Sequence, residues 1–220
     1  MSNLVEIEHL CKHYPLGRRL FHKSDVVRAV EDVSLNIARG QNLGLVGESG
    51  CGKSTLGRTV LRLADPTSGK VTIDGVNVTA LSSKELTAFR RRAQMIFQDP
   101  QASLNPRHTI ERSLKDAMAF HGLATEKREL EDRAVEMLEQ VGMNGDALKR
   151  YPHQFSGGQQ QRICIARALS LKPELLVCDE AVSALDVSVQ AQVVNLLQDL
   201  QAQFGLTYLF ISHGLAVVKH

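Results

Sequence analysis

This 220-residue chain has few cysteines, no long apolar run and little net charge, and each of these excludes or disfavours a class of protein. Only four cysteines occur and none forms a C-x-x-C pair, so we expect reduced thiols, with no metal site and no disulfide framework built from them. No apolar run approaches the ~18 residues that a membrane-spanning helix needs. The formal net charge is only +2, so the charge does not call for a nucleic-acid partner.

The N-terminus lacks the basic start and the apolar core of a signal peptide, so we expect none. If the protein works at a membrane, it therefore has to dock onto a separate membrane subunit. The remaining composition, with 43% hydrophobic and 23% charged residues, is ordinary for a soluble globular protein, and the cysteines favour the cytosol. A chain of this length suffices for one core, or for one core and a small lobe.

The segment Gly47–Thr55 reads GESGCGKST and matches the phosphate-binding pattern G-x-x-x-x-G-K-[ST]. It lies between an apolar run at 42–47, predicted to be a buried strand, and a segment with helical spacing of apolar residues. Glycines let backbone N–H groups turn toward phosphates, and the helix N-terminus adds its dipole. The alternative is a glycine turn that only caps a helix. The candidate nucleotide-binding residues here are Gly47, Ser49, Gly50, Cys51, Gly52, Lys53, Ser54 and Thr55.

Within this loop, Lys53 is expected to reach the β- and γ-phosphates and the Ser54 hydroxyl to bind Mg²⁺. Asp179 and Glu180 end a second apolar run at 175–178, where buried carboxylates need partners. We expect Asp179 to hold Mg²⁺ directly or through water, and Glu180 to polarise the attacking water as general base. An acidic pair after a strand is, in the alternative, only a surface turn.

Three further candidates carry weaker signals. Gln98 ends the predicted strand at 93–97, where an amide can bind both a metal ion and a water. His213 follows the strand at 206–211, although such a histidine is more often structural. Tyr14 is placed to stack on a purine ring, although a tyrosine in a loop usually only packs.

A second glycine-rich segment, Phe155–Gln159, places Ser156 as N-cap before a helix predicted over 157–171. The positive end of this helix dipole predicts a second anion site at the segment, and the alternative is an ordinary capped helix. If both anion sites cannot face one nucleotide within a subunit, two subunits placed head to tail can enclose it.

Strands alternating with helices in the second half predict a parallel α/β core. Strands at the start predict a β-rich edge, and the mostly helical stretch over 82–148 predicts an inserted lobe. We expect a single domain over 1–220, with the core at about 1–92 and 172–220 and the helical lobe at about 93–171. A basic loop is predicted at 17–23.

Taken together, these residues resemble the ATPase subunits of ATP-binding-cassette (ABC) transporters over essentially the whole chain. Gly47–Thr55 is similar to the Walker A loop and Leu175–Glu180 to Walker B with its catalytic glutamate. Phe155–Gln159 is similar to the LSGGQ signature, with Phe in place of Leu. The other matches are Gln98 to the Q-loop, 183–186 (SALD) to the D-loop, His213 to the switch histidine and Tyr14 to the adenine-stacking aromatic.

The resemblance implies an α/β P-loop NTPase fold: a RecA-like core with an antiparallel β edge and an inserted α-helical lobe that carries the signature. It implies ATP and Mg²⁺ as cofactors, with Ser54, Gln98 and Asp179 at the metal. It also implies that ATP is enclosed between Walker A of one subunit and the signature of another. Ser156, Gly158 and Gln159 then act in trans on the γ-phosphate. Gln98, Glu180 and His213 are the implied catalytic set.

Longer stretches, among them 97–107 (FQDPQASLNPR) and 183–192 (SALDVSVQAQ), resemble bacterial dipeptide and oligopeptide importers, with nickel importers as close relatives. The implied partners are a second, related ATPase subunit, two permeases and a periplasmic or lipoprotein solute-binding protein, with no nucleic acid. A heterodimer is expected and a homodimer stays open. The implied location is the cytoplasmic face of the inner membrane, as a peripheral subunit.

Other functions stay open beside peptide import. The cargo is alternatively nickel or another small solute, or the chain binds nucleotide without hydrolysing it. A soluble ABC ATPase acting on ribosomes or DNA is disfavoured, because the chain shows one cassette, no heptads and no strong basic patch. Two departures from the family stand out: Gly214 replaces the usual Asp beside His213, and the chain ends at His220 where relatives continue, so we expect a truncated C-terminus.

Overall fold

The computed structural model describes residues 2–16 and 25–212. The basic loop predicted at 17–23, the candidate His213 and its neighbour Gly214 lie outside the described residues. Among the residues described, no helix combines the length and the apolar character needed to cross a bilayer.

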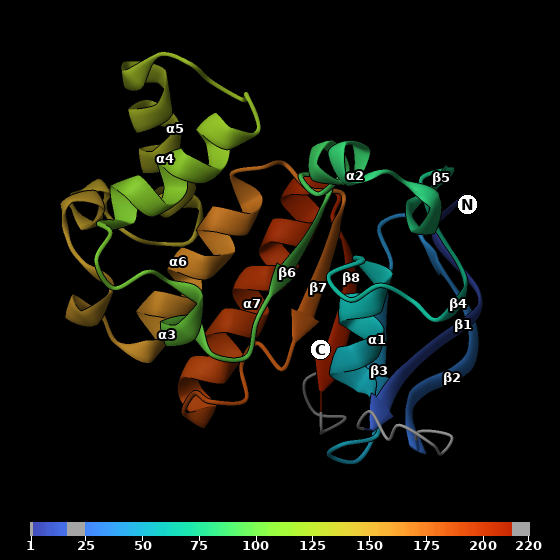
Figure 1. Cartoon of the computed structure of the whole chain (residues 1–220). Helices are drawn as coiled ribbons and strands as arrows, with labels where there is room; N and C mark the ends of the chain where they lie inside the picture. The colour runs from blue at the N-terminus through green and yellow to red at the C-terminus, as the bar shows by residue number, and fades with distance from the viewer. Residues whose placement is uncertain (1, 17–24, 213–220) are drawn as a thin grey trace.

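Two four-stranded sheets form the frame of the molecule (Figure 1). The first sheet is antiparallel, in the order β2-β1-β4-β5, and consists of β1 (Asn3–Leu16), β2 (Asp25–Ala38), β4 (Ser68–Ile73) and β5 (Val76–Asn77). The second is parallel, in the order β3-β8-β7-β6, and consists of β3 (Asn42–Val46), β6 (Ala93–Ile96), β7 (Leu175–Asp179) and β8 (Thr207–Ser212). This arrangement confirms the predicted parallel α/β core with an antiparallel β edge.

Helix α1 (Lys53–Val60) lies between the two sheets and contacts strands of both. Its apolar residues Leu56 and Val60 are buried in one core with residues from β1, β4, β7 and β8. Gly57 lets the helix approach the parallel sheet closely, because a Cβ there would lie 2.7 Å from Ile211 Cδ1. The position of the helix N-terminus, directly after β3, is therefore set by packing on both sides.

The remaining helices are α2 (Ser83–Phe89), α3 (Pro100–Ser103), α4 (Ile110–Phe120), α5 (Lys127–Gln140), α6 (Gly157–Leu169) and α7 (Val187–Phe204), with short 3₁₀ turns at Val78–Ala80, Gly145–Lys149 and Pro152–Gln154. Helix α2 begins with a capping box, in which Ser82 and Glu85 each accept from the other's backbone N–H. Helices α3 to α6 stand beside the sheets (Figure 1), and residues of α4 to α7 share a second core, in which Ile110, Leu114 and Ile163 are fully buried.

Two strands bear on the expectations for Tyr14 and for the lobe boundary. Tyr14 lies in β1 rather than in a loop, because β1 and β2 remain paired as far as Leu16 and Asp25. Strand β6 falls within the stretch predicted as the helical lobe, yet it pairs with β7 inside the parallel sheet. We therefore propose that the lobe begins after Ile96.

An ion-pair network joins the two sheets at their shared end. Arg39 and Arg92 each pair with both Asp74, in the turn after β4, and Glu174, just before β7. Arg39 Nη1 lies 2.8 Å from Glu174 Oε2, and Arg92 Nε donates to Glu174 Oε1 at 2.7 Å. Partial burial alone would raise the pKa of Glu174, but the hydrogen bonds from Arg92 and Arg39 outweigh it and lower that pKa.

Replacing Glu174 by Gln is expected to lower the free energy of unfolding at pH 7 by about 1 kcal/mol, a value suited to a partly exposed network. Because the pKa of Glu174 is lower in the folded state than its ordinary 4.5, its contribution is complete above that pH. The contribution falls as the pH drops toward the folded-state pKa. Urea titrations of both proteins from pH 7 to pH 3.5 test this. A difference that stays constant with pH would contradict it.

Candidate functional site

The segment Gly47–Thr55, called the P-loop below, connects the end of β3 to the start of α1, as predicted. Gly52 is the N-cap residue of α1 and has a φ of 98°. A Cβ at this position would lie 1.9 Å from the Ala29 carbonyl oxygen on β2. Only glycine therefore fits here, and the tight contact presses the loop against the antiparallel sheet.

The Lys53 side chain lies inside the P-loop. Its Nζ donates to the carbonyl oxygens of Gly47 and Glu48, both at 2.7 Å, and lies 3.8 Å from Cys51 Sγ. The residue is only 6% exposed, so the ammonium group is held in place rather than left in solvent. A positive charge enclosed by a glycine-rich loop at a helix N-terminus suits a phosphate group.

The end of β7 brings a carboxylate to the first turn of α1. The Ser54 hydroxyl donates to Asp179 Oδ1 at 2.6 Å, and Arg58 Nη2 lies 3.9 Å from Asp179 Oδ2. The Asp179 side chain is only 5% exposed, and these two groups supply partners for its buried charge. The hydroxyl and the carboxylate together form an oxygen donor pair of the kind that Mg²⁺ prefers.

Glu180 follows directly and has a positive φ of 49°. Its backbone is held on both sides: its N–H donates to the Ile211 carbonyl at 2.9 Å, and its carbonyl accepts from the Ser183 N–H at 3.0 Å. The Ser183 hydroxyl donates to that same carbonyl at 2.9 Å and also accepts from Gln98 Nε2 at 3.3 Å. The ends of β6 and β7 thus bring Gln98 and Glu180 to the same place.

The P-loop and the two strand ends surround one cavity of about 480 Å³, called the nucleotide cavity below. Residues 49–55 of the P-loop, Gln98 and Glu180 line it. Val27, Arg28 and Ala29 of β2 complete its wall. Sequence reasoning missed these three, because nothing in the local pattern of β2 shows that the strand passes over the P-loop.

The second glycine-rich segment lies elsewhere. Ser156 caps α6, and its hydroxyl accepts from Gln159 N–H at 3.4 Å, as predicted for an N-cap. Ser156 and Gln159 are exposed, and neither they nor Gly158 line the nucleotide cavity. Gly158 also has a packing role, because a Cβ there would lie 2.5 Å from Val189 Cγ1 on α7. Within one subunit the structure therefore does not bring the two anion sites together.

Tyr14 lies at the edge of the site rather than in it. It pairs across the sheet with Val27, which lines the nucleotide cavity, and the residue is 40% exposed. Lys12 Nζ lies 4.8 Å from the centre of the ring. Strand β8, which His213 follows in the chain, pairs its last residue Ser212 with Val46 just before the P-loop.

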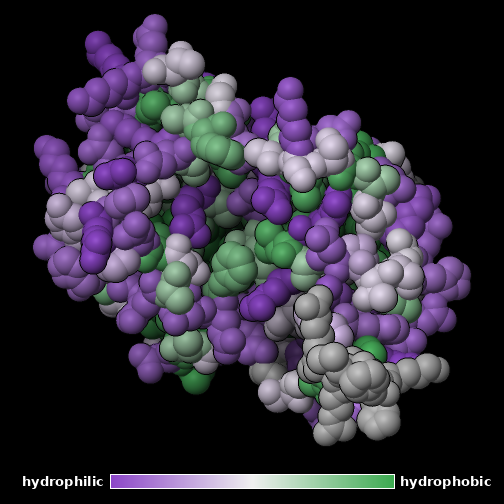
Figure 2. All heavy atoms as spheres, viewed as in Figure 1, coloured by the Kyte–Doolittle hydropathy of each residue, from purple (hydrophilic) through white to green (hydrophobic). Residues whose placement is uncertain are grey.

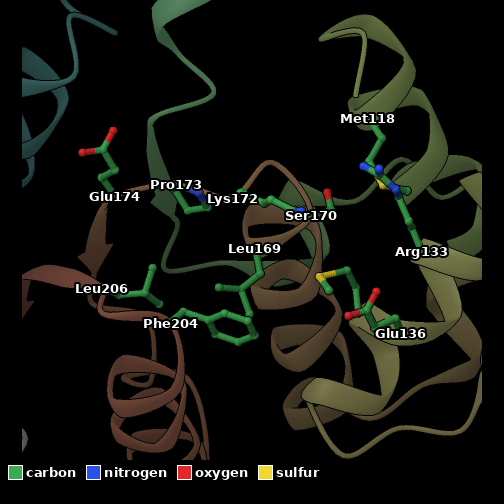
Figure 3. Close-up of a pocket in the computed structure, with 11 residues that line it drawn as sticks. Met118, Arg133, Glu136, Leu169, Ser170, Lys172, Pro173, Glu174, Phe204 and Leu206 are labelled. Carbon is green, nitrogen blue, oxygen red and sulfur yellow. The ribbon is translucent and has the colours of Figure 1, made fainter. Parts of the chain in front are cut away.

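Several hollows lie outside the nucleotide cavity, and two of them bear on function. One of about 590 Å³ is lined by residues of α5, α6 and the end of α7, with Arg133 and Glu136 on one side and Phe204 on the other (Figure 3). It contains none of the predicted site residues. The other, of about 480 Å³, lies between β6 and α4 and is called the Phe120 groove below. Figure 2, drawn in the same view as Figure 1, shows a recess with apolar surface near the middle of the molecule.

The fold and the site together define a class: an α/β protein in which a P-loop and two strand ends form a nucleotide cavity. A family profile described as ABC transporter matches residues 30–183. The chain belongs to this family and carries its ATPase domain.

Curated proteins similar in sequence to this chain are named as ATP-binding proteins of peptide transport. The oligopeptide transport ATP-binding protein OppF of Bacillus subtilis is 53% identical over 100% of this chain and 70% of its own length. The putative oligopeptide transport ATP-binding protein YkfD of the same bacterium is 55% identical over 99% of the chain and 64% of its own length. A putative peptide import ATP-binding protein of Brucella ovis is 54% identical over 99% of the chain and 66% of its own length. The chain thus spans about two thirds of these relatives.

Solved structures agree on the fold. The ATP-binding cassette MJ0796, in a dimeric post-hydrolysis state bound to ADP and Pi, superposes with a TM-score of 0.84 at 31% identity, covering 97% of this chain and 89% of that chain. A second dimeric structure of the same bacterial ABC transporter cassette gives a TM-score of 0.85 at 32% identity over 98% of this chain and 90% of that chain. The predicted P-loop NTPase fold is confirmed.

Proposed function

We propose that this chain is the ATP-hydrolysing subunit of an importer that carries peptides across the bacterial inner membrane. The observation that supports hydrolysis best is the nucleotide cavity itself, where the P-loop, Gln98 and Glu180 meet around one space. A protein that only binds nucleotide needs the P-loop but does not need the carboxylate and the amide facing it.

In this proposal the P-loop N–H groups and Lys53 bind the β- and γ-phosphates. Glu180 accepts a proton from the attacking water, and Gln98 orients that water. The backbone of Glu180 is hydrogen-bonded to Ile211 and Ser183, which fixes where its side chain leaves the end of β7. His213 is proposed to contact the γ-phosphate from the segment that follows β8, and Tyr14 to stack on the adenine.

The donor set at Ser54 and Asp179 fits Mg²⁺, with Gln98 as a third oxygen ligand from the facing strand. When bound with ATP, this ion neutralises charge on the phosphates. Asp179 has a second task in the chain alone, because its hydrogen bond with Ser54 ties the end of β7 to the start of α1.

Ser156, Gly158 and Gln159 are proposed to complete the nucleotide site of a second ATPase subunit. Two observations support this role: the segment is exposed at a helix N-terminus, and it lies outside this chain's own nucleotide cavity. The dimeric cassettes that share the fold are consistent with such a pair. We expect the second subunit to be a related ATPase, with a homodimer as the alternative.

Peptides are the proposed cargo because the three relatives described above, at 53 to 55% identity, are named for oligopeptide or peptide transport. Two permeases and a solute-binding protein complete the proposed complex, at the cytoplasmic face of the membrane. Nickel or another small solute is the alternative cargo. Uptake of labelled tripeptide and of labelled nickel, measured in cells with and without this chain, separates the two. Loss of nickel uptake alone would contradict the peptide proposal.

The Phe120 groove is the proposed contact with a permease. Phe120 is 72% exposed and Leu63, which also lines the groove, is 46% exposed, so the groove presents two large apolar side chains that a partner can cover. Phe97 also lines the groove and directly precedes Gln98 in the chain. A permease segment bound in the groove would contact Phe97, and the next residue in the chain, Gln98, lines the nucleotide cavity.

Replacing Phe120 by Asp is expected to weaken binding of the permeases at least about tenfold, because a buried aromatic anchor contributes much of an interface's energy. ATP binding by the chain alone should stay unchanged. Phe204→Asp is the matched control, because Phe204 is 45% exposed and lies at the other cavity. Copurification of the complex and peptide uptake check the prediction. An effect of Phe204→Asp equal to that of Phe120→Asp would contradict it.

A further inference from the structure

We propose that Cys11, His13 and Glu31 form a binding site for a zinc-type divalent metal ion, separate from the nucleotide cavity. A sulfur, an imidazole nitrogen and a carboxylate oxygen from these residues all lie within 4.8 Å of one another. The cysteine spacing predicts no metal site, because it contains no C-x-x-C pair. The third ligand comes from the neighbouring strand, which cysteine spacing does not take into account.

The fold explains why these three side chains meet. Cys11 and His13 are two positions apart on β1, so their side chains lie on the same face of the strand. Leu10 pairs with Val33 and Lys12 with Val30, so two residues of β2, Glu31 and Asp32, stand opposite Cys11 alone. This is a β-bulge, and bulges re-aim side chains.

Polar contacts already organise the cluster. His13 Nε2 and Glu31 Oε2 lie 2.8 Å apart, and the Asp32 backbone N–H donates to Cys11 Sγ at 3.2 Å. That N–H contact suits a metal-bound thiolate. The side chain of His13 is 25% exposed and that of Glu31 is 48% exposed, so an ion can enter from solvent.

The donor set selects the class of metal. Zinc binds cysteine sulfur at about 2.3 Å, histidine nitrogen at about 2.0 Å and carboxylate oxygen at about 2.0–2.2 Å, often with water as fourth ligand. The three donors need only small shifts from their present spacing to surround such an ion. Mg²⁺ and Ca²⁺ prefer sets made of oxygen alone, so a thiol and an imidazole disfavour them.

Metal binding releases one proton and replaces one hydrogen bond. The Cys11 thiol releases its proton to solvent as the sulfur–metal bond forms, and the metal replaces the hydrogen bond between His13 and Glu31. Arg28 Nε lies 3.7 Å from the same Glu31 oxygen, so the metal also competes with Arg28 for that carboxylate. Arg28 also lines the nucleotide cavity, so this one side chain contacts both the cavity and the proposed metal site.

The test uses Co²⁺ as a spectroscopic probe on the purified, metal-stripped full chain. We expect one equivalent to give a sulfur-to-cobalt charge-transfer band that Zn²⁺ removes by displacement. Cys11→Ser should lose the band. Glu31→Gln and His13→Gln should weaken Zn²⁺ binding at least about tenfold. Cys51→Ser is the matched control, because Cys51 is an exposed thiol in the P-loop outside the proposed site.

A band that persists in Cys11→Ser, or that disappears in Cys51→Ser, would overturn the proposal. Absence of the band in the wild-type chain would do the same. Glu31→Gln guards against misfolding of the cysteine variant, because the Glu31 side chain is about half exposed and the glutamine amide keeps its shape. Unchanged Zn²⁺ affinity in a folded Glu31→Gln variant would remove Glu31 from the site and overturn the three-ligand assignment.

Discussion

A Gly52→Ala chain is expected to lose most of its affinity for ATP, with a decrease of about 100-fold or more. The φ of 98° alone costs an alanine roughly 1–3 kcal/mol. The new Cβ would also lie 1.9 Å from the Ala29 carbonyl oxygen, and a backbone atom cannot move aside as a side-chain end can. The P-loop must therefore shift. Each 1.4 kcal/mol of lost binding energy weakens affinity tenfold.

Gly75→Ala separates loop displacement from simple backbone strain. Gly75 has a φ of 75°, but no atom lies within 4 Å of the position that a Cβ would take there, and the residue lies in the turn between β4 and β5, away from the nucleotide cavity. We expect this control to lose some stability and to bind ATP normally. Fluorescent-ATP titration and thermal unfolding measure both effects. Normal ATP affinity in a folded Gly52→Ala chain would contradict the explanation.

A Glu180→Gln chain is expected to bind ATP within a few-fold of wild type but to turn it over about 10²–10⁴-fold more slowly, which is the range that a general base contributes. The amide keeps the size of the side chain, and the backbone hydrogen bonds to Ile211 and Ser183 do not depend on the carboxylate. The change therefore removes a proton acceptor while leaving the cavity in place.

Glu48→Gln is the matched control for this experiment. Glu48 is an exposed carboxylate within the P-loop that does not line the nucleotide cavity, so its loss should leave turnover near the wild-type rate. Phosphate release by the three purified chains gives the comparison. Equal and slow hydrolysis by the wild-type chain and Glu180→Gln would favour the alternative in which this chain binds nucleotide without hydrolysing it.

The predictable part of the site is the part encoded locally. The P-loop could be placed because a strand, a glycine-rich turn and a helix follow one another in the chain. Gln98 and Glu180 could be proposed because each follows an apolar strand, and parallel strands end at one edge of their sheet. The convergence then follows from the pairing of β6 with β7.

Contacts between distant segments could not be predicted in this way. Nothing in the sequence of β2 shows that Ala29 presses against Gly52 or that Arg28 lines the cavity. The assignment of β6 to the parallel sheet likewise depends on a partner some 80 residues away in the sequence, since Ala93 pairs with Leu175. Glu31 meets Cys11 because of a bulge, and bulges leave no regular sequence pattern.

The central claim is that the two glycine-rich segments of one chain serve different nucleotide sites. ATP titration of the isolated, dilute chain tests it most directly, with Gly52→Ala in the P-loop compared with Ser156→Arg at the exposed start of α6. We predict that Gly52→Ala loses ATP affinity while Ser156→Arg retains it, and that both abolish turnover in the assembled transporter. A loss of ATP affinity in isolated Ser156→Arg as large as that in Gly52→Ala would contradict the claim.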